Sequence, residues 1–119
     1  GKTEASTVLE KEDTIAIYGS NEFAAKAIIN ANGGFKESKL GADKILAVGF
    51  DSGALQQDAI RKGIFVGSVT QDPVQIGYQA VKLAIAAAKG ETVKDVDTGS
   101  KWYDAKNIDS EEIKALLYE

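Results

Sequence analysis

The chain has 119 residues, of which 44% are hydrophobic and 27% are charged, a composition typical of one globular domain with a buried core. Its net charge of −4 argues against a nucleic-acid partner, because the phosphate backbone is bound by basic surfaces. The sequence contains no Cys and no His, which excludes disulfides, thiolate and imidazole metal sites and Ser-His-Asp catalysis, and leaves only carboxylates, Lys, Tyr and hydroxyls as catalytic groups.

The first part of the chain alternates between strand-like and helix-like segments. Residues 1–13 are mostly polar and predict the end of an amphipathic helix. The short apolar run Thr14–Tyr18 predicts a buried strand. Residues 22–32 then repeat apolar side chains at helical spacing, and Gly33 favours the end of this helix. The polar residues 35–43 predict a connecting loop.

The same alternation continues twice more. Ile45–Val48 and Phe65–Val69 predict strands, and residues 54–62 between them predict a helix. Asp72 is suited to cap a third helix, which we expect to run from Pro73 to about Lys89. This helix is apolar on most of its faces, so it should be covered on more than one side.

The sequence changes in character after Gly90. Lys94–Thr98 predicts a fourth, more exposed strand, and residues 109–112 resemble a capping box that begins a last helix over Ile113–Tyr118. Because strands and helices alternate along the chain, we expect an α/β fold: a three-layer αβα arrangement with a mainly parallel sheet and right-handed crossovers.

Polar side chains follow three of the predicted strands at the point where each strand ends. They are Asn21, Asp51 and Gln71. The carboxyl ends of parallel strands meet at one edge of a sheet, and ligands of open α/β sheets bind at that edge. Amides and carboxylates suit a hydroxyl-rich ligand, and Phe50 would offer an apolar face to the C–H groups of a ring. The pattern predicts a binding site for a small polar molecule.

Helix capping is an alternative explanation for part of this pattern. Asn21 is placed to cap the helix that follows it, and Asp51 or Ser52 is placed to cap the next one. Gln71 has no structural duty of this kind. Among the aromatic residues, Trp102 and Tyr103 are interpreted as packing residues.

No motif for a cofactor or a metal is evident. The glycine-rich turn over residues 49–53 lacks the spacing and the Lys of a phosphate-binding loop. The paired carboxylates Glu111 and Glu112 suit the first turn of a helix and do not form an acid/base pair. We expect no cofactor and no metal site.

Six short motifs follow one another in a characteristic order. They are NE at Asn21–Glu22, VGFD at Val48–Asp51, TQDP at Thr70–Pro73, IGYQAVKLA at Ile76–Ala84, KGE at Lys89–Glu91 and DTGS…KNID at Asp97–Asp109. Together they resemble the C-terminal part of the type I periplasmic binding proteins of ABC importers, of the ribose-binding kind. The same fold forms the effector-binding core of lactose-repressor-like transcription factors. The resemblance runs from about Thr14 to the end of the chain.

This resemblance implies a function in solute binding and no enzymatic activity. In the family a sugar is held between two lobes. The residues matching Asn21, Asp51 and Gln71 hydrogen-bond its hydroxyls, and the residue matching Phe50 packs near its ring. The residue matching Gln71 also lies near the hinge between the lobes.

The resemblance also implies that residues 1–119 form a single α/β unit of a larger, two-lobed protein. Residues 14–71 would belong to the C-terminal lobe, and residues 73–98 would pack with an N-terminal lobe that is missing here. Because the chain does not begin with Met, we expect it to be processed or excised from something longer. The parent protein would be extracytoplasmic, in the periplasm or as a cell-surface lipoprotein, and would meet the permease subunits of the importer.

The sequence admits three other interpretations. The chain resembles the effector-binding core of a lactose-repressor-like regulator in fold, but its tail from Asp97 onward looks more like that of a transport protein. An enzyme of flavodoxin-like architecture has the same alternation, but the absence of His, Cys, a phosphate loop and an acid pair counts against it. The third is a stand-alone interaction module made from half of a binding protein. The apolar helix over residues 73–89 also predicts that the isolated chain exposes an apolar patch or forms a homodimer.

Overall fold

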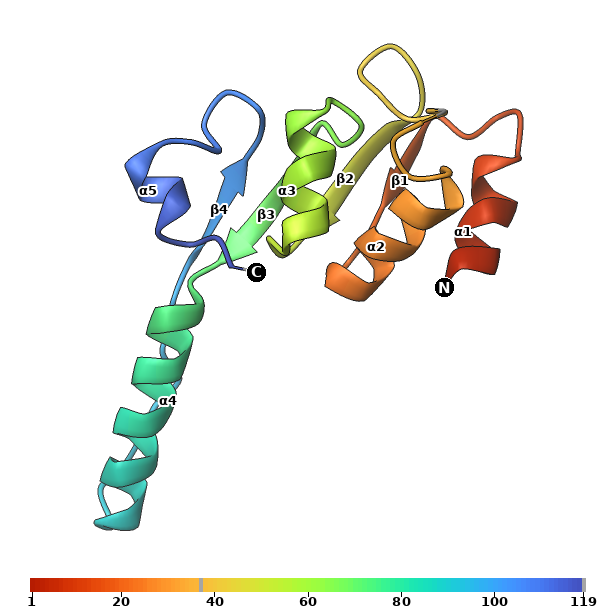
Figure 1. Ribbon diagram of the computed structural model, residues 1–119. Helices are drawn as coiled ribbons and strands as arrows, with labels where there is room; N and C mark the ends of the chain where they lie inside the picture. Colours follow the sequence, from red (N-terminus) through yellow and green to blue (C-terminus); the bar gives the residue numbers. More distant parts are fainter. Residues whose placement is uncertain (37, 119) are drawn as a thin grey trace.

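The computed structural model describes residues 1–36 and 38–118. Its sheet is four-stranded, in the order β1-β2-β3-β4, and consists of β1 (Ala16–Tyr18), β2 (Leu46–Phe50), β3 (Gly67–Gln71) and β4 (Ser100–Tyr103) (Figure 1). The first three strands are parallel and β4 is antiparallel to β3. The predicted α/β fold with a mainly parallel sheet is confirmed.

The fourth strand is not where the sequence pattern placed it. Residues 94–98, predicted as a strand, have no strand structure, and the chain joins the sheet only at Ser100. The pairing of β4 with β3 begins at Gln71↔Ser100, directly after Gly99, whose φ is +77°. The prediction for 94–98 was wrong because this segment is still on its way back to the sheet and has no neighbouring strand to pair with.

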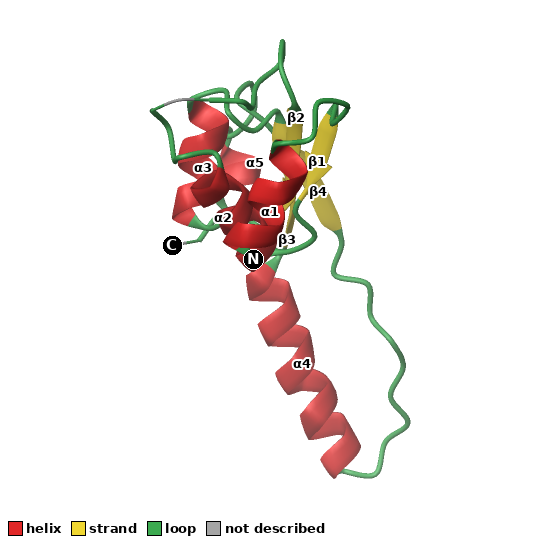
Figure 2. Ribbon diagram, turned by 90° about the vertical axis from the view of Figure 1, so that its right-hand side faces the viewer, coloured by secondary structure: helices red, strands yellow, loops and turns green. Residues whose placement is uncertain are grey.

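Four helices lie on one side of the sheet (Figure 2). They are α1 (Lys2–Leu9), α2 (Glu22–Ala31), α3 (Ala54–Arg61) and α5 (Glu111–Lys114). The core between them and the sheet contains Ile29, Ala47, Ile60, Phe65 and Tyr103, each at most 1% exposed. Because apolar burial contributes about 25 cal/mol per Å², this layer is the main source of stability of the fold.

The last helix ends earlier than predicted. The predicted cap is present, since the Ser110 side chain accepts a hydrogen bond from the Ile113 amide. The helix itself begins at Glu111, two residues before the predicted start at Ile113, and ends at Lys114 instead of Tyr118. Beyond it, the carbonyl of Leu116 accepts from Ser52 at 3.4 Å and the carbonyl of Tyr118 accepts from Gln57 at 2.8 Å. These hydrogen bonds hold the backbone of Leu116 and Tyr118 against Ser52 and Gln57, so these residues do not continue the helix.

The second face of the sheet has no helix on it among residues 1–36 and 38–118 (Figure 2). The strand register places apolar side chains on this face, which we call the open sheet face: Ala16, Tyr18, Leu46, Val48, Phe50, Val69 and Trp102. Tyr18 is 58% exposed and Trp102 is 44% exposed. The described part of the chain therefore covers one side of its sheet only.

The remaining helix, α4 (Pro73–Ala88), projects away from the body of the molecule (Figures 1 and 2). Asp72 caps it, since its Oδ1 accepts from the Gln75 amide at 2.9 Å. None of the residues of α4, all of which the structure describes, is buried. The radius of gyration is 17.1 Å, larger than the roughly 13–14 Å of a compact domain of this length. Within the described ranges, no helix combines the length and apolar character needed to cross a membrane.

Candidate functional site

The parallel strands end at one edge of the sheet, the lower edge in Figure 1, and the predicted site residues gather there. Asn21 lies just beyond β1, Phe50 and Asp51 lie at the end of β2, and Gln71 is the last residue of β3. We call this edge the carboxyl rim. The structure brings the four residues to one rim because β1, β2 and β3 run in the same direction.

Asn21 caps α2 and still presents part of its side chain outward. Its Oδ1 accepts a hydrogen bond from the Ala24 amide at 2.8 Å, so the capping interpretation is correct for this oxygen. The side chain is exposed, and its Nδ2 has no acceptor among residues 1–36 and 38–118. The side chain of Asn21 can therefore cap α2 through Oδ1 while its Nδ2 stays available as a donor.

Asp51 has an unusual backbone. Its φ is +80°, and it is the sole non-glycine residue with positive φ in the described part of the chain. The left-handed region costs an L-residue about 1–2 kcal/mol, so local contacts must hold it there. Its amide donates to the carbonyl of Val69 at 2.7 Å, and its Oδ2 accepts from the amide of Glu22 at 2.9 Å. Asp51 thus reaches across to α2 and does not cap α3.

Buried side chains donate hydrogen bonds to the carbonyl oxygen of Asp51. It accepts from the hydroxyl of Tyr103 at 2.8 Å and from Oγ of Ser68 at 2.9 Å. Nε2 of Gln56 lies 3.4 Å from the same oxygen and donates to the carbonyl of Phe50 at 2.7 Å. Tyr103, Ser68 and Gln56 are each 0% exposed, so their polar groups depend on these bonds.

Phe50 and Gln71 lie at the ends of β2 and β3 on the rim. Phe50 is half-buried on the open sheet face, opposite Val69 in the register. Gln71 is exposed, and it pairs with Ser100 of β4 at the point where the chain leaves the sheet and returns. A shallow cavity of about 290 Å³ borders Gln71 between the two crossing segments and Leu116.

Two residues of the rim were not predicted as site residues. Glu22 is half-buried, forms an ion pair with Lys26, and its Oε2 accepts from the Tyr118 hydroxyl at 3.5 Å. The four-residue spacing of Glu22 and Lys26 is typical of an exposed helix pair and gives no sign of the contact with Tyr118. Tyr103 was interpreted as a packing residue, and the direction of its hydroxyl is not encoded in any local pattern.

Burial also changes the acidity of two tyrosines at the rim. Loss of hydration raises the pKa of Tyr103 to about 12. Burial likewise raises the pKa of Tyr118. Both hydroxyls therefore keep their protons at neutral pH and remain hydrogen-bond donors.

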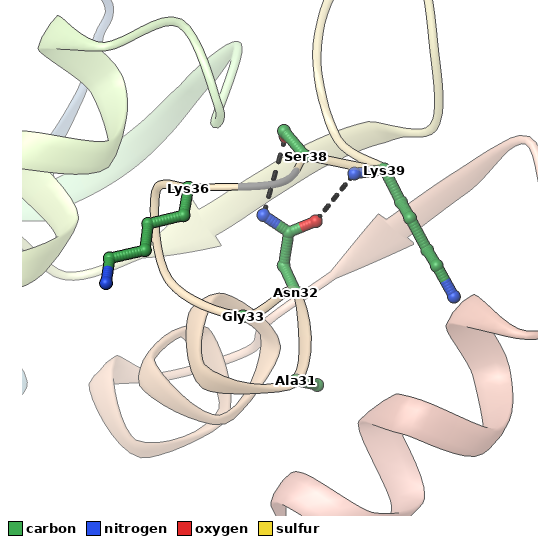
Figure 3. A pocket seen from close by; sticks show the side chains of 6 residues that line it. All are labelled: Ala31, Asn32, Gly33, Lys36, Ser38 and Lys39. Atoms are coloured by element: carbon green, nitrogen blue, oxygen red, sulfur yellow. Dashed lines mark hydrogen bonds between the residues drawn. The ribbon is translucent and has the colours of Figure 1, made fainter.

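A larger hollow, of about 530 Å³, lies at the opposite edge of the sheet, beyond the last turn of α2 (Figure 3). Its centre is Asn32, which is only 5% exposed. Oδ1 of Asn32 accepts from the Lys39 amide at 2.8 Å, and its Nδ2 donates to the Gly34 carbonyl at 3.0 Å. Because the loop itself satisfies this side chain, Asn32 is a loop-fixing residue and the hollow is not part of the predicted site.

The rim residues have no arrangement that would hold a metal. In residues 1–36 and 38–118 no group of three or more carboxylates is placed to ligate an ion. The chemistry of the rim is instead that of hydrogen bonding, with acceptors from Asp51, donors and acceptors from Asn21 and Gln71, and an apolar ring from Phe50.

Comparison with solved structures shows close similarity to transport and regulatory proteins. The chain is 42% identical to an ABC transporter, LacI family transcriptional regulator from Brachyspira murdochii, with a TM-score of 0.83 over 99% of this chain and 40% of the other. It is 28% identical to an ABC transporter solute-binding protein from Agrobacterium vitis with bound D-fucose, with a TM-score of 0.84 over 98% of this chain and 40% of the other.

A third structure agrees with these two. It is a carbohydrate transporter solute-binding protein from Agrobacterium radiobacter in complex with D-arabinose, 28% identical, with a TM-score of 0.77 over 98% of this chain and 40% of the other. The chain thus spans about 40% of the length of the structures that it matches. The αβα fold expected from the sequence is the fold of these proteins.

Comparison with curated protein sequences found no match. The profile of the periplasmic binding protein domain, in contrast, matches residues 1–92, which is most of the chain. This chain belongs to the periplasmic binding protein domain family.

Proposed function

We propose that this chain supplies one side of a sugar-binding cleft in the solute-binding component of an ABC importer. The observation that carries the proposal is the gathering of Asn21, Phe50, Asp51 and Gln71 at one carboxyl rim. The solute-binding proteins from Agrobacterium vitis and Agrobacterium radiobacter, with bound D-fucose and D-arabinose, support a sugar as the ligand class. In this proposal the chain is a binding protein and has no catalytic role.

Each rim residue would take one part of the contact. Oδ1 of Asp51 has no donor among residues 1–36 and 38–118, so it is available to accept from sugar hydroxyls. Nδ2 of Asn21 would donate to a hydroxyl oxygen, and the exposed amide of Gln71 would donate and accept. The ring of Phe50 would contact the C–H groups of the sugar. A cleft of this kind combines an apolar surface with a few placed polar groups.

The proposal includes a second lobe that closes on this rim. Residues 14–71 would belong to the C-terminal lobe, and residues 73–98 would pack with the N-terminal lobe. The exposed apolar side chains of α4, among them Val74, Tyr78, Val81 and Ile85, support this arrangement. The two-lobed protein would work outside the cytoplasm and deliver the sugar to permease subunits, as the family membership suggests.

The experiment is titration calorimetry of the two-lobed protein that contains this chain with D-fucose, D-arabinose and a non-sugar polyol such as glycerol. We expect saturable binding of at least one sugar and none of glycerol. The 119-residue chain alone should show no binding, because a few hydrogen bonds of about 0.5–3 kcal/mol each do not offset the roughly 4–15 kcal/mol cost of association. Absence of sugar binding by the two-lobed protein would contradict the proposal.

A second candidate is favoured by one comparison. The structure from Brachyspira murdochii is that of an ABC transporter, LacI family transcriptional regulator, so an effector-binding core of a lactose-repressor-like regulator is an alternative. The net charge of −4 speaks against direct DNA contact by this chain, although it does not exclude an effector site. A gel-shift assay of the two-lobed protein with the promoter DNA of its own gene, with and without sugar, separates the two functions.

A further inference from the structure

The hydroxyl of Tyr103 reaches Asp51 across an intervening strand. Tyr103 lies on β4 and pairs in register with Ser68 of β3, and both side chains face the helix-covered side of the sheet. From there both hydroxyls converge on the carbonyl oxygen of Asp51, at 2.8 Å from Tyr103 and 2.9 Å from Ser68. The end of β2 is therefore tied to β3 and β4 by side-chain hydroxyls beyond the last ladder bond.

These bonds determine the direction of the Asp51 side chain. The amide of Asp51 is fixed to the Val69 carbonyl at 2.7 Å, and its own carbonyl is fixed to the two hydroxyls. With both flanking peptide groups held, the backbone dihedrals between them are held as well, at a φ of +80°. This sets the direction of the Cα–Cβ bond and places Oδ2 at 2.9 Å from the Glu22 amide.

We propose that Tyr103 is a positioning residue for the ligand contact at Asp51: its hydroxyl holds the left-handed backbone that directs the carboxylate to the carboxyl rim. Relaxation of Asp51 to an extended backbone would turn its carbonyl away and leave the buried hydroxyls of Tyr103 and Ser68 without this acceptor. The inference rests on the proposed function for the sugar itself, but the orientation of Asp51 is a property of the free chain.

If Tyr103 served only to pack the core, removal of its hydroxyl would have a different effect on Asp51. The ring of Tyr103 is 0% exposed and belongs to the core, and a Phe ring would fill the same space. If packing were the whole role, loss of the hydroxyl would alter overall stability and leave the local geometry at Asp51 unchanged. The difference between Tyr and Phe at this position therefore isolates the hydrogen bond.

The first measurement is amide hydrogen exchange by NMR on the free chain with Tyr103→Phe. The Glu22 amide donates to the Asp51 carboxylate, whereas the Ala24 amide donates to Asn21 at the same end of α2, which makes Ala24 an internal control. We expect exchange at Glu22 to accelerate about tenfold relative to Ala24. Equal acceleration at both amides, or none, overturns the proposal. Ser68→Ala removes the second hydroxyl and should shift Glu22 in the same direction.

The second measurement is sugar affinity in the two-lobed protein. We expect Tyr103→Phe to weaken binding about tenfold in the wild-type background and to cause no further loss in an Asp51→Ala background. Ile60→Val, which trims a buried side chain of α3 away from the rim, is the control and should leave affinity unchanged. Equal losses in both backgrounds overturn the proposal, since Tyr103 would then act independently of Asp51. If the wild-type protein binds no sugar, the proposed function fails, and the exchange measurement alone decides the positioning role.

Discussion

Gly19 lies so close to the backbone of Ala25 that a Cβ on Gly19 would sit 2.7 Å from the Ala25 amide nitrogen. This contact brings the end of β1 against the first turn of α2. Asn21, at the carboxyl rim, lies in the short connection between them. Backbone atoms, unlike the end of a flexible side chain, cannot move aside without shifting the helix.

Gly19→Ala should therefore destabilise the chain by about 1–3 kcal/mol, the usual cost of overpacking a tight contact. The matched control is Gly77→Ala on α4, where a Cβ meets nothing within 4 Å. That change should stabilise the helix by up to about 1 kcal/mol. Urea unfolding of the two variants checks the pair, and equal midpoints for Gly19→Ala and the wild type would contradict the close approach.

Asp51→Ala should weaken sugar binding more than Asn21→Ala or Gln71→Ala in the two-lobed protein. A carboxylate makes charge-assisted hydrogen bonds of about 1.5–3 kcal/mol, against about 0.5–1.5 kcal/mol for a neutral amide. This corresponds to a loss of roughly tenfold to more than a hundredfold for Asp51→Ala. Titration calorimetry gives the ranking, and an unaltered affinity of the Asp51→Ala protein would remove Asp51 from the site.

The free chain should bind a hydrophobic dye and self-associate through its exposed apolar surfaces. Val81 on α4 is 62% exposed and Tyr18 on the open sheet face is 58% exposed. Contiguous apolar patches of more than a few hundred Å² are unusual on monomers. Sedimentation velocity with dye fluorescence tests this, and Val81→Lys should reduce association whereas Lys82→Arg should not. A clean monomer that binds no dye would speak against it.

The pKa of Tyr103 predicts a pH dependence of stability. It is about 12 in the folded chain, against an ordinary value of 10.0 for tyrosine. Between these pH values the folded state keeps a proton that the unfolded state loses, so the free energy of unfolding should fall as pH rises from about 10 to about 12. Below about pH 10 this contribution is fully present. Its size is about 2–3 kcal/mol.

Unfolding curves at pH 9 to 12 measure this step. Tyr103→Phe should lose the part of the slope that the buried hydroxyl causes, and Tyr78→Phe on the exposed α4 should keep it. If the Tyr103→Phe chain shows the same decline as the wild type, other groups cause it.

Hydrophobic periodicity was sufficient to predict the first three strands and the helices α2, α3 and α4. Within each of these segments the apolar residues recur at the spacing of a strand or of a helix, so the secondary structure is predictable from the segment alone. The ends were less predictable, because Phe50 and Gln71 are in strands only through partners on the neighbouring strand. Residues 94–98 alternate like a strand, but strand propensity does not supply a partner.

The candidate site divides in the same way. Asn21, Asp51 and Gln71 were visible as polar residues that follow apolar runs, and the structure places them at one rim. Tyr103 and Ser68 were not visible, because each acts on the Asp51 carbonyl from a distant part of the sequence, 52 and 17 residues away. No local pattern reports where a buried hydroxyl points. The role of the rim residues in binding stays a prediction.

The pairing of Gln71 with Ser100 means that the chain leaves the sheet and re-enters it at neighbouring positions. In topological terms, residues 72–99 are an insertion into a β-hairpin, since β3 and β4 are consecutive antiparallel strands that a two-residue turn is able to join. A shortened chain in which Asn-Gly replaces this excursion would keep the whole sheet and the helices on it. The carboxyl rim would then belong to a compact domain without α4. The hydrogen bonds between β3 and β4 would be kept, because they do not involve residues 72–99.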